Sequence, residues 1–209
     1  MLDKKVILIG YSGHAYVVAD IAIENQYNII GYTEKSRVVN NPFNLNYAGY
    51  EREIDFFEKN KKIGFIIGIG DNLIREKIYN LITSKNAQVT TLISNTASIS
   101  HSVMIDNGTF VNRNVSINAL AKIGKNVILN TACVIDHECE ISDSVHIGPG
   151  AVLAGNVLVG ERTFIGANSV IKQGVQIGKD VIVGAGTVVL CDIPDGKKVV
   201  GNPNRYLNG

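Results

Sequence analysis

The sequence lacks an excess of charge of either sign. Its 209 residues contain 20 Lys and Arg against 19 Asp and Glu, which leaves a formal net charge of +1. The two kinds of charge are interspersed, so there is no basic stripe of the kind that attracts nucleic acid or an anionic membrane. We therefore expect no nucleic-acid or membrane partner, and look instead to small molecules and to further copies of the same chain.

Long apolar runs and paired cysteines are also missing. The apolar stretch 6–9 is shorter than a signal-peptide core, and no run approaches the roughly 18 apolar residues of a membrane span. The three cysteines are too few for a disulfide framework. Together these absences predict a cytoplasmic protein whose thiols stay reduced.

What the chain does have is a repeat of six residues. Every sixth residue between Ile93 and Val189 is aliphatic, and a small or β-branched residue follows each of them four positions later, up to Thr187. A fixed period is read before local propensity because it decides the architecture. The aliphatic positions are Ile93, Ile99, Ile105, Val111, Ile117, Ile123, Leu129, Ile135, Ile141, Ile147, Leu153, Val159, Ile165, Ile171, Ile177, Val183 and Val189.

This pattern predicts a parallel β-helix with a narrow triangular coil over about 93–190. One large and one small side chain on each face would fill the interior, which places Cys133 and Cys139 in the core. Three hexads make a coil of 18 residues, so residues 18 apart should stack about 4.7 to 4.9 Å apart. The tail after Val189 breaks the period, and we expect it to be a loop that packs back along the coil.

A different pattern precedes residue 90. Strands alternate with helices there, which is typical of a small parallel α/β unit with helices on both faces. We therefore divide the chain into a Rossmann-like domain, 1–92, and a β-helix domain with its C-terminal tail, 93–209. The expected elements of the first domain are strand 6–9, helix 15–25, strand 27–32, helix 51–60, strand 63–69, helix 73–84 and strand 88–93.

The stacking rule singles out His137 as a candidate base. It would lie between Ala119 and Gly155, which leave open space around an imidazole at the edge of the coil. Asp136 and Glu138 flank it, and either carboxylate could orient the ring, as a general base requires. The plain alternative is a solvated surface histidine.

A metal site built from Cys133, His137 and Cys139 is a further alternative. Geometry disfavours it, because both cysteines should point into the coil while His137 lies at a corner. We therefore expect no metal.

The first domain has a candidate binding site where its first strand turns into a helix. Backbone amides at such a turn can receive a phosphate. The turn lacks the G-x-G-x-x-G pattern, so nicotinamide binding is weakly supported, and a glycine turn beside a solvated acid is the alternative. Glu34 follows about 20 residues later, where an acid commonly reaches a ribose. The residues expected in this crevice are Gly10, Ser12, Gly13, His14, Glu34, Gly70 and Asn72.

These motifs together resemble a known family. The hexads resemble the left-handed β-helix of bacterial hexapeptide-repeat acyltransferases. The segments G-Y-S-G-H, FIIGIGDN, ILNTACVIDHECEISDSVHIGPGAVLAGNV and GNPNR are similar to those of the nucleotide-sugar acetyltransferases of the bacillosamine and perosamine type. Those enzymes acetylate the 4-amino group of a 4-amino-4,6-dideoxy sugar. The chain is also similar to sialic acid O-acetyltransferases.

The resemblance implies roles for particular residues. His137 would be the general base and Glu138 would hold its imidazole. His146 would lie near the acetyl thioester, Asn130 would contact the sugar, and Gly155 would admit the pantetheine arm. Ala185 and Arg205 would also bind acetyl-CoA, the latter through phosphate.

The same resemblance implies an assembly and a reaction. Members are homotrimers with active sites between subunits, where acetyl-CoA lies in the groove between two coils. The expected reaction is direct N-acetylation of a UDP- or dTDP-linked amino sugar for surface glycans. Lys35 stands where many relatives have a second acid after Glu34, and a sialic acid acceptor would tolerate it. The alternatives are therefore a sialic acid O-acetyltransferase and a non-catalytic β-helix that only binds a sugar nucleotide.

Overall fold

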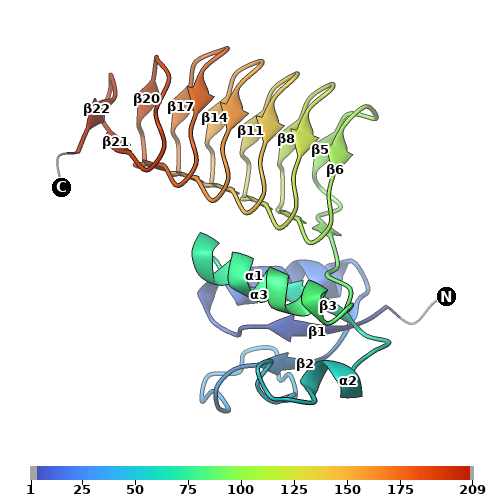
Figure 1. Cartoon of the computed structure of the whole chain (residues 1–209). Helices are drawn as coiled ribbons and strands as arrows, with labels where there is room; N and C mark the ends of the chain where they lie inside the picture. The colour runs from blue at the N-terminus through green and yellow to red at the C-terminus, as the bar shows by residue number, and fades with distance from the viewer. Residues whose placement is uncertain (1–3, 208–209) are drawn as a thin grey trace. The chain divides into compact units, whose positions relative to one another are not determined.

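The structure, a computed structural model that describes residues 4–207, contains two compact units (Figure 1). The first unit ends at Leu92 and the second begins at Ile93. Each is described by itself below. The fold class expected from the sequence is confirmed: an α/β unit is followed by a left-handed parallel β-helix of hexapeptide repeats.

The first unit is built on a parallel sheet of three strands. These are β1 (Lys5–Ile9), β2 (Asn28–Thr33) and β3 (Gly64–Ile67), in the spatial order β2-β1-β3. The order reverses direction after β2, so a crevice opens at the carboxyl ends of the strands, where ligands bind in open α/β sheets. The three strand ends that face this crevice carry the residues predicted for the binding site.

Helices cover both faces of this sheet. On one face Ile7, Ile9, Phe65 and Ile67 pack with α2 (Phe56–Lys59) and α3 (Asn72–Ser84). On the other face lies α1 (Gly13–Glu24), and the closeness of its Ala15 to Gly68 leaves no room for a Cβ at Gly68. Alternate residues of β1 therefore feed two separate hydrophobic layers, as the period of a strand requires.

Two elements of the first unit differ from the prediction. The expected helix 51–60 is only α2, since Phe56 and Phe57 are the buried pair in it, while Ile54 is 94% exposed. The expected strand 88–93 is divided: Val89 makes one bridge to Phe65, and Leu92–Ile93 already belongs to the β-helix. The two ends of this short segment pack in different cores, Val89 in that of the first unit and Ile93 in that of the β-helix.

The second unit has two-residue strands at every sixth position, which form three parallel sheets (Figure 1). We name each sheet by one of its strands. The β13 sheet contains β4 (Leu92–Ile93), β7 (Phe110–Val111), β10 (Ile128–Leu129), β13 (His146–Ile147), β16 (Phe164–Ile165) and β19 (Ile182–Val183). The β11 sheet contains β5 (Ser98–Ile99), β8 (Ser116–Ile117), β11 (Val134–Ile135), β14 (Val152–Leu153), β17 (Val170–Ile171) and β20 (Val188–Val189). The β12 sheet contains β6 (Met104–Ile105), β9 (Lys122–Ile123), β12 (Glu140–Ile141), β15 (Leu158–Val159) and β18 (Gln176–Ile177).

The interior of the coil is as the hexads predict. Ile135, Ile147 and Leu153 are fully buried, and so are Cys133 and Cys139 at the small inward position. Residues 18 apart pair across adjacent coils throughout, for example Ile135 with Leu153. Side chains inside the coil therefore stack in columns, and the outer surface repeats with the same spacing.

The corners of the coil depend on a left-handed backbone. Fourteen consecutive hexads, from Gly108 to Gly186, have a residue with positive φ at the equivalent corner position. Gly and Asn adopt this conformation at low cost, whereas other side chains are strained in it. Eight of these fourteen turn residues are Gly or Asn, and the other six are Leu120, Ala132, Glu138, Ser144, Arg162 and Asp180.

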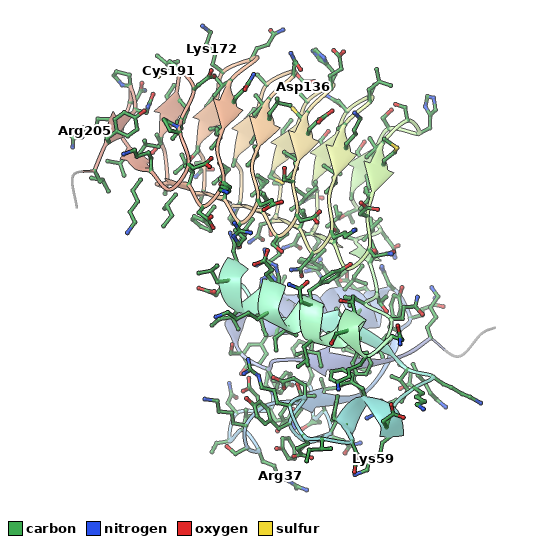
Figure 2. The ribbon with its side chains drawn as sticks, viewed as in Figure 1. Arg37, Lys59, Asp136, Lys172, Cys191 and Arg205 are labelled. Carbon is green, nitrogen blue, oxygen red and sulfur yellow. The ribbon has the colours of Figure 1, made fainter. Side chains whose placement is uncertain are left out.

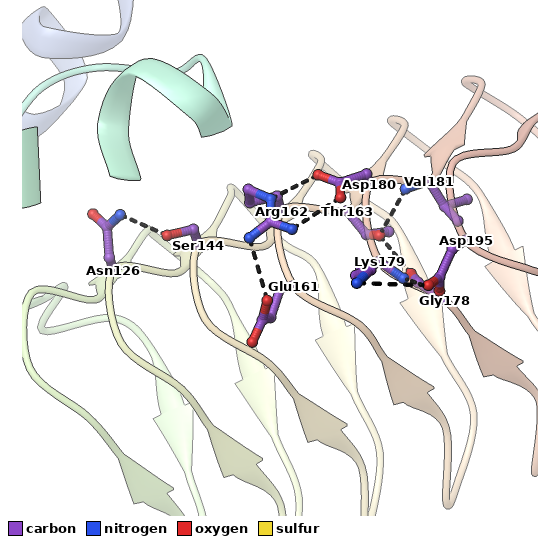
Figure 3. Close-up of polar contacts among 10 residues, drawn as sticks. All are labelled: Asn126, Ser144, Glu161, Arg162, Thr163, Gly178, Lys179, Asp180, Val181 and Asp195. Carbon is purple, nitrogen blue, oxygen red and sulfur yellow. Dashed lines mark hydrogen bonds and ion pairs between the residues drawn. The ribbon is translucent and has the colours of Figure 1, made fainter. Parts of the chain in front are cut away.

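One corner, between the β12 and β13 sheets, is joined by polar side chains (Figure 3). Arg162 donates to both carboxylate oxygens of Asp180, at 2.7 and 2.9 Å, and this lowers the pKa of Asp180. Nearer the start of the coil, Asn126 donates to Ser144 at 2.9 Å. Each pair spans 18 residues, so these contacts fasten one coil to the next.

The tail differs from the predicted loop that packs back along the coil, because it closes the end of the coil instead. Its strand β21 (Lys198–Val200) pairs in parallel with β19. The strand β22 (Arg205–Tyr206) then pairs antiparallel with β21. Backbone groups at the end of the last coil need partners, and the tail supplies them. No helix among residues 4–207 is both long and apolar enough to span a bilayer.

We predict that Ile141→Ala lowers the free energy of unfolding by about 2 to 5 kcal/mol, because it opens a cavity in a closed interior. Ile141 is 2% exposed. The matched control is Glu140→Ala in the same strand: this side chain is exposed and forms an exposed ion pair with Lys122, so we expect a change below about 1 kcal/mol. Chemical denaturation at fixed protein concentration measures both. Equal losses for the two variants would contradict this account of the coil.

Candidate active site

His137 lies on the turn between β11 and β12, with its imidazole held by its neighbour in sequence. The ring Nδ1 is 3.0 Å from Oε2 of Glu138. A carboxylate at Nδ1 favours the tautomer that has its proton there, which leaves the Nε2 lone pair available to accept a proton. Both side chains are about half exposed, so the pair is open to an incoming substrate.

Asp136, the other acid beside His137, has a different function. Its Oδ1 accepts from the backbone N–H of His137 at 2.7 Å and from Nδ2 of Asn118 at 2.8 Å. The hydrogen bond from Asn118, followed by that from the His137 backbone, lowers the pKa of Asp136. Of the two acids that could orient the imidazole, Glu138 is the one whose carboxylate reaches it, while Asp136 shapes the turn.

Gly155 lies directly against the His137 ring. A Cβ built at Gly155 would overlap Cε1 and Nε2 of the imidazole. The backbone around the ring follows the predicted stack, since Glu138 N donates to Ala119 O and Asn156 N donates to His137 O. Gly155 is therefore required by the position of the ring, in addition to the role that the resemblance gives it.

Glu138 occupies a strained corner. Its φ is +59°, in the left-handed region that most other corners fill with Gly or Asn. A non-glycine residue there costs roughly 1 to 2 kcal/mol. Equivalent corners at Leu120, Ala132, Ser144 and Arg162 have the same conformation, so the contact with His137, and not the strain, distinguishes Glu138.

A second polar cluster surrounds His146 on β13. Oδ1 of Asn130 accepts from Asn112 and from the Thr131 backbone, so its amino group faces His146 Nε2 at 3.2 Å. The imidazole meets the ring of Phe164 edge-on, with centroids 5.0 Å apart. His146 is 9% exposed, so this cluster is far more enclosed than the His137 turn.

Within one chain the two clusters lie on different sides of the coil. The turn of His137 joins the β11 and β12 sheets, whereas Asn130 lies at the corner between the β13 and β11 sheets and His146 lies on the β13 sheet itself. The face of the β11 sheet separates them. A single coil therefore does not bring His137 together with Asn130 and His146.

The remaining residues predicted for acetyl-CoA lie toward the C-terminal end of the coil. Ala185 is exposed on the turn after β19. Arg205, which is labelled in Figure 2, lies on β22. Figure 2 also shows Asp136 and Lys172 along one edge, where residues 18 apart stack. The structure places Ala185 and Arg205 on the surface and leaves their roles as predictions.

The first unit contains a cavity of about 550 Å³ at the carboxyl ends of its strands. Four of the predicted residues line it: Gly10, Ser12, Glu34 and Gly70. Gly10 has φ +82°, which a side chain would resist. Ser12 precedes α1 without a side-chain cap, and the space beside Gly13 is open, so the first amides of the helix face no capping group.

Glu34 is held in place on the wall of the cavity. Its Oε1 accepts from the backbone N–H of Tyr11 at 2.9 Å, which links the end of β2 to the glycine turn. Lys35, whose presence departs from the pattern of many relatives, also lines the cavity. The cavity therefore has a fixed carboxylate and a cation at the end of the same strand.

Gly13, His14 and Asn72 are outside the set that lines the cavity, and the last two adjoin Arg75. This arginine is 1% exposed, and it donates to Gly70 O at 3.0 Å and to Asn72 Oδ1 at 2.9 Å. Burial lowers the pKa of Arg75 to about 9, and burial together with Arg75 lowers the pKa of His14 to about 4. Sequence reasoning missed Arg75, since an arginine in an amphipathic helix is normally solvated.

Comparison with known proteins addresses both units. Residues 5–82 match the family model described as the PglD N-terminal domain, and residues 157–191 match that of a hexapeptide repeat of succinyl-transferase. A histidine-to-asparagine variant of perosamine N-acetyltransferase from Caulobacter crescentus, in complex with CoA and GDP-perosamine, shares 32% identity and a TM-score of 0.93. That match covers 98% of this chain and 97% of the other. The chain belongs to the hexapeptide-repeat sugar acetyltransferases.

Two further structures resemble this acetyltransferase over almost its whole length. The acetyltransferase domain of PglB from Neisseria gonorrhoeae, in complex with acetyl coenzyme A, has 32% identity and a TM-score of 0.91, with 98% of this chain and 100% of that chain covered. WeeI from Acinetobacter baumannii has 27% identity and a TM-score of 0.88, with 97% and 99% covered. The likeness includes both units. This acetyltransferase and the two matched proteins therefore all combine an α/β unit with a β-helix.

The cysteines and acids of the acetyltransferase do not form a metal centre within residues 4–207, where no group of three or more His, Cys, Asp or Glu side chains could hold an ion. Burial raises the pKa of Cys133 to about 12, and burial also raises the pKa of Cys139. Sγ of Cys139 is 3.2 Å from Ala154 O, inside the coil. Because the thiolate is the nucleophilic form, neither cysteine is suited to attack a thioester at neutral pH.

We predict that Gly155→Ala lowers kcat of the acetyltransferase at least about 100-fold, because the added methyl displaces the His137 ring from its position. The melting temperature should change little, since the methyl lies outside the packed interior. Gln173→Ala, one coil further along the same column, is the control and should retain activity. Steady-state kinetics and thermal melting distinguish the two effects. Full activity in Gly155→Ala would contradict the assigned ring position.

We predict that His14 makes the stability of the acetyltransferase depend on pH between about 6.5 and 4. Its pKa is lower in the folded state, so the unfolded state takes up a proton that the folded state refuses. The free energy of unfolding should therefore fall as the pH drops through this window, by roughly 1 to 3 kcal/mol from this residue. Denaturation curves at pH 7 and pH 4.5 should show a smaller fall for His14→Gln than for wild type. If the free energy of unfolding fell by the same amount in His14→Gln and in wild type, His14 would not be the cause.

Proposed function

We propose that this protein transfers an acetyl group from acetyl-CoA to the 4-amino group of a nucleotide-linked 4-amino-4,6-dideoxy sugar, for surface-glycan synthesis. The observation that carries the proposal is the His137–Glu138 pair, whose Nδ1 contact of 3.0 Å leaves Nε2 facing the bare backbone of Gly155. A ring oriented in this way is suited to accept a proton from an attacking amine. A solvated surface histidine has no need of such an arrangement.

In the proposed reaction the amine nitrogen attacks the thioester carbonyl directly. A C–N bond forms, the C–S bond breaks, and the proton of the amine passes to His137 Nε2 and then to the departing thiolate of CoA. Glu138 stabilises the imidazolium, and a backbone amide stabilises the oxyanion. The high pKa of Cys133, together with the inward position of Cys139, supports direct transfer without an acyl-enzyme.

The acceptor is proposed to be bound through its nucleotide in the cavity of the first unit. Support comes from the cavity at the strand ends, the uncapped start of α1 and the fixed carboxylate of Glu34. The perosamine N-acetyltransferase binds GDP-perosamine, which supports a nucleotide-sugar acceptor for this chain. A UDP- or dTDP-linked sugar stays a prediction from the sequence.

We further propose that the active site is completed by a second copy of the chain in a homotrimer. The face of the β11 sheet, which separates His137 from Asn130 and His146, presents an outward column of valines: Val134, Val152, Val170 and Val188. Stacked apolar side chains on an outer face favour contact with another copy. A neighbour packed there could bring its own Asn130 and His146 toward His137.

Two other functions would use part of the same geometry. O-acetylation of a sialic acid is compatible with the cation of Lys35 in the cavity. A protein that only binds a sugar nucleotide would not need a carboxylate 3.0 Å from the ring of His137. The contact between Glu138 and His137 therefore favours an enzyme over a binding scaffold.

We predict that His137→Asn lowers kcat by about 100- to 10,000-fold, the usual contribution of a general base. Release of free CoA thiol from acetyl-CoA is measured with GDP-, UDP- and dTDP-linked 4-amino-4,6-dideoxy sugars and with free and CMP-linked sialic acid. The matched control is His101→Asn, two coils away in the same column, which should keep wild-type rates.

The outcomes separate the three functions. Alkali-stable product from an amino sugar supports N-acetylation, whereas alkali-labile product formed only from sialic acid moves the assignment to ester formation. Unchanged turnover in His137→Asn would show that His137 is not the general base. Absence of turnover with every acceptor, combined with nucleotide binding, supports the binding scaffold.

A further inference from the structure

Asn112 is a buried amide one coil before Asn130, in the same column of the β-helix. It is 1% exposed, and its Nδ2 donates to Oδ1 of Asn130 at 2.9 Å and to Oγ1 of Thr131 at 2.8 Å. Its own Oδ1 accepts from the backbone N–H of Arg113 at 2.7 Å. A backbone N–H can only donate, so this last contact fixes which end of the Asn112 amide faces Asn130.

The orientation of Asn112 decides that of Asn130. Oδ1 of Asn130 accepts from two donors, Nδ2 of Asn112 and the backbone N–H of Thr131 at 2.8 Å. Both lone pairs of this oxygen are thereby used, and Nδ2 of Asn130 is left to meet Nε2 of His146 at 3.2 Å. An amino group offers only hydrogens, so Nε2 accepts, and the proton of the neutral ring lies on Nδ1.

The coil itself does not require an asparagine at these positions. The same column continues, one coil apart, with Gly148, Gly166 and Gly184. A side chain at Gly148 would collide with the backbone of the next coil, at the carbonyl of Ile165. From Gly148 onward the column therefore has no room for amides, and the two asparagines are confined to the coils that precede His146.

A comparable arrangement supports the other histidine. Nδ2 of Asn118 donates to Oδ1 of Asp136, which accepts from the backbone N–H of His137. There the contacts end on the backbone of the turn, whereas those that begin at Asn112 end on an imidazole. In both clusters an asparagine from the preceding coil determines the geometry beside a histidine.

We propose that Asn112 is a positioning residue for acetyl transfer: by fixing the amide of Asn130, it holds His146 as the neutral ring with its proton on Nδ1. Asn130 then presents N–H and no acceptor, so the substrate atom that meets it must accept a hydrogen bond. Because Nε2 of His146 is already engaged, His146 does not compete with His137 for the proton of the attacking amine. This inference rests on the proposed function for the roles of Asn130 and His146.

The first measurement is the ring tautomer of His146 in the full chain without substrates. A long-range nitrogen–proton correlation spectrum with isotope-labelled histidine shows which ring nitrogen has the proton, and His146→Gln identifies the signal among the four histidines. We expect the proton on Nδ1 at neutral pH. Asn112→Ala removes a donor that holds Asn130, so its spectrum should show both tautomers. A proton on Nε2 in wild type, or an unchanged tautomer in Asn112→Ala, would overturn the inference.

The second measurement separates positioning from stability. Asn112→Ala should lower kcat/KM for the acceptor about 3- to 10-fold through a higher KM, the effect of one misaligned hydrogen bond. The matched control, Asn126→Gly, removes a comparable buried bond between coils, from Asn126 to Ser144 at 2.9 Å, and keeps the left-handed corner. It should melt earlier than wild type but keep the tautomer and the kinetics. An equal change of tautomer in the control would reduce the effect to a general loosening of the coil and refute the inference.

Asn130→Asp tests the same series of contacts if Asn112→Ala does not fold. Its carboxylate keeps the contacts with Asn112 and Thr131, and its second oxygen places an acceptor in front of Nε2 of His146. The proton should therefore move to Nε2, and an unchanged ring would contradict the series. The tautomer is measured without an acceptor. Absence of turnover with every sugar would thus defeat the proposed function alone, whereas turnover in a wild type with its proton on Nε2 would defeat the positioning role alone.

Discussion

The left-handed corner that recurs every six residues is the constraint on which the β-helix depends. Three such corners bring the chain back to its starting direction after 18 residues, and the coil can then pair with the next one, as Ile135 does with Leu153. If one corner lost this conformation, every later side chain would change face. The unbroken period therefore reflects a geometric requirement as well as the need for an apolar interior.

That requirement leaves a limited number of positions for chemistry. The inward residues must fill the coil, so reactive side chains can occur only on the strands' outer faces or at the corners. One corner is fastened by Arg162 and Asp180, whereas another has Glu138, whose carboxylate holds His137. Both kinds of corner obey the same backbone rule, since Arg162 and Asp180 have positive φ just as Glu138 does. The functional corner differs in having a glycine, Gly155, at the position stacked on His137.

The repeat and its columns could be predicted from sequence because period and burial are local properties of an array. The stack of His137 on Gly155 follows from counting 18 residues, and the structure places the ring there. The choice of Glu138 over Asp136 as the partner of the ring could not be predicted, since both acids are adjacent to it in sequence. Nor could the buried position of Arg75, because it depends on how separate segments meet around the strand ends of the first unit.

The tail, with its antiparallel strands β21 and β22, has a consequence for the behaviour of the protein in concentrated solution. A stack of parallel coils ends in unpaired backbone groups, which form a template for another chain. Here the tail reaches each sheet in turn: β21 pairs beside β19, Gly201 and Asn204 bond to Val188, and Ile193 bridges Ile177. The last rung is thereby made unavailable for end-to-end growth, so a fold whose geometry could continue without limit remains a discrete particle instead of a filament.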